Sequence, residues 1–124
     1  MSSDGLSWVE SLCDIPLRYH SGALSISQLF HRAAPDLGDP RILDLIRSHL
    51  RQHPELLAGW QNYSYDKRGV PSPFLDGLDV GFVESSEGSV VVRKIWRYES
   101  PDDACAQFIL SEAAWVLQRR ELPE

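Results

Sequence analysis

Apolar residues recur at helical spacing through the first half of the chain. One set consists of Ile42, Leu43, Ile46 and Leu50. This is the spacing of a stripe that one face of a helix buries. Comparable stripes predict helices over residues 6–13 and 25–33 and from residue 55 onward. The inward-facing residues of the last of these are Leu56, Leu57, Trp60 and Tyr63.

Polar residues and prolines mark where these helices begin and end. Ser25 is followed three residues later by Gln28, the spacing of a capping box. Asp39-Pro40 and the run at residues 53–55 each place a proline directly after a candidate cap, as the first turn of a helix allows. We expect the helix over residues 6–13 to end at Pro16, because proline interrupts helical hydrogen bonding.

The pattern changes to period two after residue 68, where glycine and prolines exclude a helix. Residues 74–75, 78–84 and 89–98 are predicted strands, joined by Asp76-Gly77 and by residues 85–88. Such short connections predict an antiparallel meander. In the last strand we expect one apolar face to meet the helices, with Lys94 as a charged exception on it and Arg93 and Arg97 opposite. The members of that face are Val90, Val92, Trp96 and Tyr98.

A final helix of about 18 residues is predicted from Ser100-Pro101-Asp102-Asp103, which supplies a cap, a first-turn proline and two acids that complement the helix dipole. Its buried stripe includes Glu112. The predicted fold class is therefore α+β: N-terminal helices, a three-stranded antiparallel meander, and a long C-terminal helix packed on the sheet. We assign all 124 residues to one domain. It divides into an N-terminal extension (1–22), a helical part (23–68), the β-meander (69–99) and the C-terminal helix (100–120).

Charge and composition exclude some classes of partner. The formal net charge is −6, so the chain lacks the basic excess that nucleic acid binding needs. No apolar run reaches the roughly 20 residues of a membrane helix, and no signal peptide is recognisable at the N-terminus. We expect a cytoplasmic protein with neither nucleic acid nor membrane as a partner. Cys13 and Cys105 are expected to be free thiols.

Recognisable catalytic and metal-binding patterns are absent from the sequence. His49 and His53 are four residues apart, as a two-histidine metal site on a helix requires. Pro54 disfavours helical geometry at His53, so we interpret His49 as solvated and His53 as a helix cap. The sequence contains no nucleophile elbow and no phosphate-cradling glycine loop. We therefore expect no enzyme activity, no cofactor and no metal.

Acids and aromatics around the meander offer a different kind of site. Residues 72–104 contain seven acids and three bases. Several of these acids lie in predicted turns. Polar turns are the simplest explanation, and a negative rim that docks a basic partner is the functional one. We interpret Trp96 and Tyr98 as core residues and Tyr65 as a surface residue. The candidate partner-binding residues are Asp76, Asp79, Glu84, Glu87, Tyr65 and Arg97.

Two segments carry a resemblance to a known family. One runs from Trp60 to Arg68 and contains Ser64-x-Asp66-Lys67-Arg68, and the other is Ala104-Cys105-Ala106-x-Phe108-Ile109. Together with a layout of helix, short strands and helix across residues 24–117, they resemble the small bacterial immunity proteins of polymorphic toxin systems.

The resemblance implies a protein that binds and neutralises a cognate toxin domain by occluding its active site. The shared motif would then be scaffold rather than interface: Trp60 and Tyr63 in the helix's buried stripe, and Asp66 and Arg68 tying the helix end to the meander. The alternative from a different class is a small-molecule-binding regulatory or adaptor domain, with a pocket between the meander and the long helix.

Overall fold

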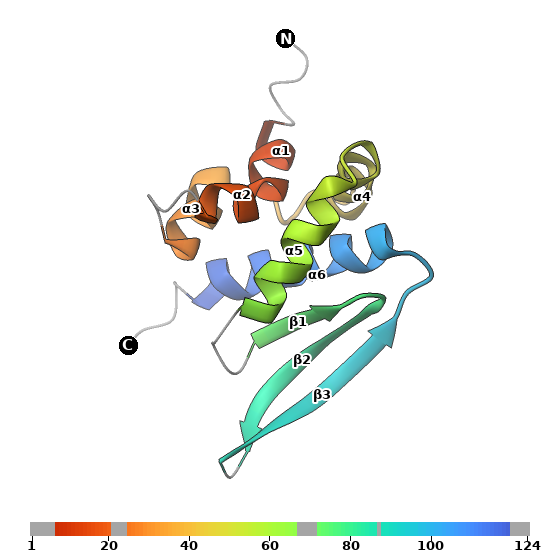
Figure 1. The fold of residues 1–124 in the computed structure, drawn as a ribbon. Coiled ribbons are helices and arrows are strands. Elements are labelled where there is room, and N and C mark those ends of the chain that lie inside the picture. The colour runs from red at the N-terminus through yellow and green to blue at the C-terminus, as the bar shows by residue number, and fades with distance from the viewer. Residues whose placement is uncertain (1–6, 21–24, 67–71, 87, 120–124) are drawn as a thin grey trace.

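The computed structural model describes residues 7–20, 25–66, 72–86 and 88–119. These residues form an α+β fold, as predicted, with helices before and after a three-stranded antiparallel sheet (Figure 1). The helices of the first half are α1 (Ser7–Cys13), α2 (Ile15–His20), α3 (Ile26–Ala33), α4 (Ile42–Gln52) and α5 (Glu55–Asp66). They are followed by β1 (Ser72–Asp76), β2 (Asp79–Ser86), β3 (Ser89–Arg97) and α6 (Pro101–Arg119).

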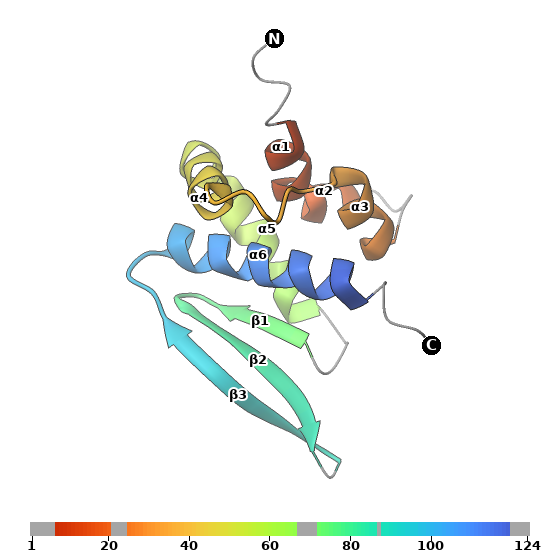
Figure 2. The same ribbon diagram turned by 180° about the vertical axis from the view of Figure 1, so that it is seen from behind.

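Helix α6 lies between helices α3 and α4 on one side and the sheet on the other. It contacts α3, α4 and α5, and it also contacts β1 and β2. Figures 1 and 2, which view the molecule from opposite sides, show α6 crossing it, with the β2–β3 hairpin extending away from the helices. The C-terminal helix therefore packs on the sheet, as the sequence predicts.

The helix starts follow local signals closely but not everywhere. Ser25 forms the predicted capping box with Gln28, with hydrogen bonds of 3.2 and 2.9 Å. At α6 the amide of Asp103 donates to the Ser100 hydroxyl at 3.3 Å. Helix α4 begins later than expected, because the Asp39 carboxylate accepts from the amide of Arg41 at 2.8 Å and holds a turn ahead of the helix.

Pro16 does not end helical structure, contrary to our prediction. The chain breaks at Asp14 and restarts at once as α2, with Pro16 in its first turn, where a missing amide proton costs no hydrogen bond. Leu12 and Ile15 on either side of the break are fully buried. Residues 7–20 are thus part of the folded core, which corrects their assignment to an N-terminal extension.

The three strands form a meander with order β1-β2-β3. Gly77 begins the two-residue β1–β2 loop with a φ of 65°, a value that favours glycine. In the β2–β3 pair the register changes between Phe82, which pairs with Lys94, and Val83, which pairs with Val92. This bulge interrupts the alternation from which we predicted a shared face for Val90 through Tyr98.

One cluster of buried side chains joins the helices and the sheet. Trp60 of α5 lies at its centre, fully buried, with its ring centroid 6.1 Å from that of Phe108 on α6. Leu75 and Val80 supply the contribution of the sheet. The helices and the sheet therefore stabilise one another through α6.

Candidate functional site: two surfaces beside the sheet

Helix α5 covers the edge of β1 through side-chain hydrogen bonds to its backbone. The Ser64 hydroxyl accepts from the amide of Leu75 at 2.8 Å, and the Gln61 amide donates to the Leu75 carbonyl at 2.6 Å. The same Gln61 side chain accepts from the amide of Gly77 at 2.7 Å. These bonds satisfy backbone groups that an edge strand would otherwise leave open. They also fix the β1–β2 turn against α5.

The described residues that brace this junction are Gln61 and Ser64. The resemblance assigned the role to Asp66 and Arg68, but Arg68 and the side chain of Asp66 lie outside the described residues. Neither Gln61 nor Ser64 was predicted to brace the junction. Trp60 and Tyr63 are interior, as expected: Trp60 donates to the carbonyl of Cys13 at 2.9 Å, and Tyr63 is buried.

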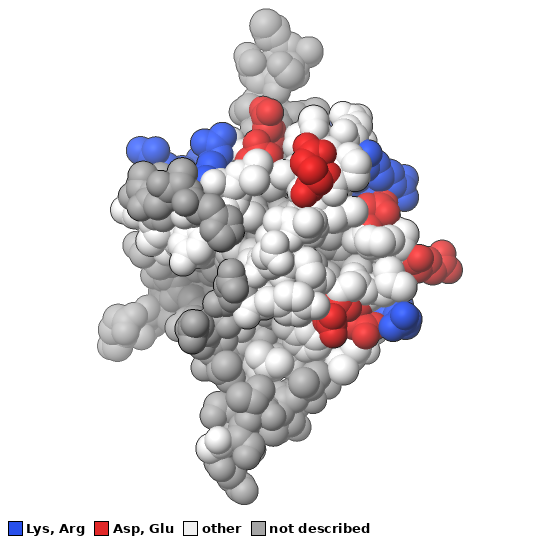
Figure 3. Space-filling view, viewed as in Figure 1, with Lys and Arg blue, Asp and Glu red and all other residues white. Residues whose placement is uncertain are grey.

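A polar surface gathers at the β1–β2 turn; we call Tyr65, Asp76, Asp79 and Arg97 the turn patch. The side chain of Tyr65 is 65% exposed, and its hydroxyl donates to Asp76 at 3.1 Å. That hydrogen bond, with the negative charge of Asp76, raises the pKa of Tyr65. Asp79 and Arg97 form an ion pair at 3.2 Å across the sheet. Figure 3 shows acidic and basic side chains meeting beside this turn, at the right of the view.

The acids of the proposed rim lie at more than one position along the sheet. Asp76 and Asp79 flank the β1–β2 turn, whereas Glu84 lies five residues further along β2. At roughly 3.3 Å per residue that separation is about 17 Å. The side chain of Glu84 and all of Glu87 lie outside the described residues. The four candidate partner-binding residues whose side chains are described, Tyr65, Asp76, Asp79 and Arg97, are placed together.

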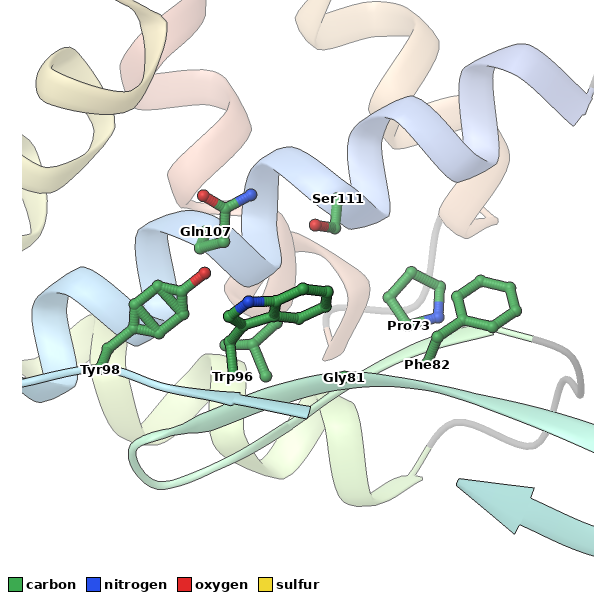
Figure 4. Close-up of a pocket in the computed structure, with 8 residues that line it drawn as sticks. Pro73, Gly81, Phe82, Trp96, Tyr98, Gln107 and Ser111 are labelled. Carbon is green, nitrogen blue, oxygen red and sulfur yellow. The ribbon is translucent and has the colours of Figure 1, made fainter. Parts of the chain in front are cut away.

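A second surface is a groove between α6 and the sheet (Figure 4). Trp96 of β3 and Tyr98 just after that strand form one wall, Gln107 and Ser111 of α6 form the other, and Pro73 and Phe82 lie at one end. We call these six residues the helix groove. Its volume is about 350 Å³. Phe82 is held by an edge-to-face contact with Trp115 of α6, at a centroid distance of 5.1 Å.

Trp96 is not a core residue, which corrects its assignment. It stands on the face that meets α6, as expected, but its side chain is 57% exposed because it borders the helix groove. A buried Trp removes roughly 200 Å² from water, so leaving about half of it exposed forgoes about 2.5 kcal/mol. Tyr98 is partly buried against the core, in agreement with its assignment.

The groove continues into a second hollow of about 330 Å³ that shares Tyr98 and Gln107 with it. Charged side chains line this hollow in balanced numbers: Arg47 and Arg97 against Glu99 and Asp103. Arg47 bonds Asp103 at 3.1 Å and also Asp44. These contacts tie α4 to the first turn of α6.

The histidines form a close pair, although Pro54 led us to doubt that geometry. The rings of His49 and His53 are 4.5 Å apart between centroids, because His53 caps the end of α4. Burial lowers the pKa of His49, and His53 lowers it further, against the opposing charges of Asp14 and Glu10. No group of three possible metal ligands occurs in the described part of the chain.

Cys13 and Cys105 are both free and buried. Burial is the main cause that raises the pKa of Cys13, to about 12, and the same cause raises the pKa of Cys105. Neither thiol has the exposed, electropositive surroundings of a reactive cysteine.

Comparison with known proteins found no match to any family model, any curated protein or any solved structure. None of the described helices combines the length and the apolar character that crossing a bilayer requires.

Proposed function

We propose that the protein binds a cognate toxin domain through the turn patch and neutralises it by covering its active site. The observation that carries the proposal is the state of Tyr65, which is 65% exposed and yet held by Asp76. The turn beneath it is braced by Gln61. An aromatic anchor held in place before binding loses little conformational freedom on association, and Tyr is among the commonest interface hot spots.

Charge supports a basic partner. The chain carries a net charge of −6, and Asp76 is exposed beside Tyr65. Such a surface would steer a basic domain towards the patch and raise its association rate. Asp79 and Arg97 already neutralise each other, so they would orient the partner more than attract it.

The contacts of the shared motif support the resemblance to immunity proteins. Trp60 and Tyr63 lie in the core, and Ser64 bonds the edge strand. These are scaffold roles, which a family can retain while its binding surface varies. An immunity protein protects its own cell from within, and two free cysteines suit a reducing cytoplasm. The proposed mechanism is binding alone and uses no catalytic group.

The test is a binding measurement with the product of the adjacent upstream gene. We expect a 1:1 complex in pulldown and calorimetry. Tyr65→Ala should weaken it at least tenfold, as hot-spot truncation does. The double variant Asp76→Lys, Asp79→Lys should weaken it several-fold and slow association.

The matched control is the double variant Glu10→Lys, Glu55→Lys, which reverses the same number of exposed acids on α1 and α5. It should retain nearly all of the affinity. Absence of binding to the neighbouring gene product would overturn the proposal. Equal losses from the turn-patch variant and the control would overturn the assignment of the surface.

A further inference from the structure

The helix groove brings together polar side-chain groups that have no hydrogen-bond partner among the described residues. They are the indole N–H of Trp96, the hydroxyl of Tyr98, the amide of Gln107 and the hydroxyl of Ser111. Gln107 and Ser111 are four residues apart on α6 and so project from the same face. Figure 4 shows Gln107 and Ser111 on the helix above Trp96, with the Tyr98 hydroxyl directed towards the same space.

These groups offer both donors and acceptors. An indole nitrogen can only donate, whereas the amide and the two hydroxyls can donate or accept. Apolar walls with a few convergent polar groups are the usual make-up of a small-molecule site. The exposed indole of Trp96 adds a flat surface on which a planar ring can stack.

Charge among the described side chains favours an uncharged ligand. The side chains that define the helix groove are all neutral. In the adjoining hollow Arg47 already bonds Asp103, and Arg97 already bonds Asp79. Among the described residues that line the groove and the hollow, a phosphate would therefore find no guanidinium that is not already paired with an acid.

We infer that the helix groove binds a neutral nucleoside, whose base stacks on Trp96 and whose edge hydrogen-bonds to Gln107. A nucleobase is flat, uncharged and edged with donors and acceptors, and bases stack on aromatic side chains irrespective of their identity. Tyr98 and Ser111 line the same groove and offer hydroxyls that can donate to or accept from the nucleoside. This site shares no residue with the turn patch, and the inference does not depend on toxin binding.

The experiment titrates the protein with adenosine, guanosine, cytidine and uridine while NMR follows the indole N–H resonance of Trp96. At least one nucleoside should shift that resonance in a saturable way. Its 5′-monophosphate should bind no more than twofold more tightly. Methyl glucoside and maltose, which share the hydroxyls but lack a planar base, should leave the resonance unchanged.

Variants assign the site. Variants at position 96 lack the indole resonance, so their nucleoside affinity is measured by calorimetry. Trp96→Ala should weaken nucleoside binding about tenfold or more, the usual result of removing a base-stacking aromatic, and Trp96→Phe should restore most of the affinity. Ile95→Ala is the matched control, because Ile95 is the neighbouring residue of β3 with nearly the same exposure, 56% against 57%, and alternation directs it to the other face. Trp96→Ala also removes the buried part of the side chain, so each affinity is measured well below the thermal midpoint of its variant.

Several outcomes would overturn the inference. One is the absence of any shift with all four nucleosides at millimolar concentration. Another is binding that Trp96→Ala leaves intact. A clear preference for the saccharides, or for the monophosphates over the nucleosides, would reject the ligand class.

Discussion

The hydroxyl of Tyr63 donates a 2.6 Å hydrogen bond to the carboxylate of Glu112 inside the core. The two residues are 5% and 2% exposed. Burial, followed by the charge of Glu112 and the hydrogen bond to it, raises the pKa of Tyr63 well above its usual range. Because a buried polar group is costly without a partner, this contact favours a single packing of α5 against α6.

We expect Tyr63→Phe to lower the free energy of unfolding by about 1–3 kcal/mol, because Glu112 stays buried and loses a donor. Urea denaturation measures the change. Tyr65→Phe removes a similar hydroxyl from the surface and should cost no more than about 0.5 kcal/mol. Equal stability of Tyr63→Phe and the wild type would show that the hydrogen bond contributes nothing net.

The braces between α5 and β1 should be visible in hydrogen exchange. Ser64→Ala removes the acceptor for the amide of Leu75, and Gln61→Ala removes the one for Gly77. Each variant should speed exchange at its own amide and cost about 1 kcal/mol. Asn62→Ala, at an exposed position between them, is the control. Unchanged exchange at Leu75 in Ser64→Ala would argue against the brace.

Stability should fall as the pH drops below about 6.5, the usual pKa of His. Burial and the neighbouring His53 lower the pKa of His49 in the folded state. The unfolded chain therefore binds a proton more readily, so protonation favours unfolding from about pH 6.5 down through the lowered pKa. His49→Gln should flatten this decline between pH 7 and 5, measured as thermal midpoint against pH. The control is His31→Gln, because His31 is exposed. If His31→Gln flattened the decline equally, His49 would not be its cause.

Both thiols should be unreactive in the folded protein. With its pKa raised to about 12, Cys13 at pH 8 would be a thiolate in only about one molecule in 10⁴, and burial also blocks access to both thiols. A colorimetric thiol reagent should therefore react only as the protein unfolds in urea. Ser48→Cys, at an exposed position on α4, should react promptly. Rapid modification of two thiols in the native wild type would contradict this.

The parts of the fold that could be predicted are those specified by local sequence signals. The capping box at Ser25, the first-turn acids of α6 and the glycine turn at Gly77 act within a few residues. They therefore specify helix starts and strand connections in any tertiary setting. Periodicity also placed Trp60 inside and Glu112 on the buried stripe, because the apolar spacing that defines each stripe repeats along a single helix.

The candidate sites were only partly predictable. Tyr65, Asp76, Asp79 and Arg97 were chosen by residue type and by nearness to turns, and the structure brings them together. Glu84 was grouped with them because it is acidic, although the predicted strand over residues 78–84 already placed it at the opposite end from the Asp76-Gly77 turn. Gln107 and Ser111 carry a signal, two polar residues one turn apart on a buried helix, that we did not use.

By itself, the sequence determined the α+β class and the order and type of the elements other than α2, because caps, turns and apolar periodicity depend on neighbours along the chain. Tertiary structure alone decided that α2 folds into the core, that Trp96 borders a groove, and that Gln61 and Ser64 brace β1. Each of these depends on contacts between separate elements, as in the pairing of Tyr63 with Glu112, 49 residues apart. No local sequence pattern encodes a contact between residues so far apart in the chain. The contact forms only when α6 packs against α5.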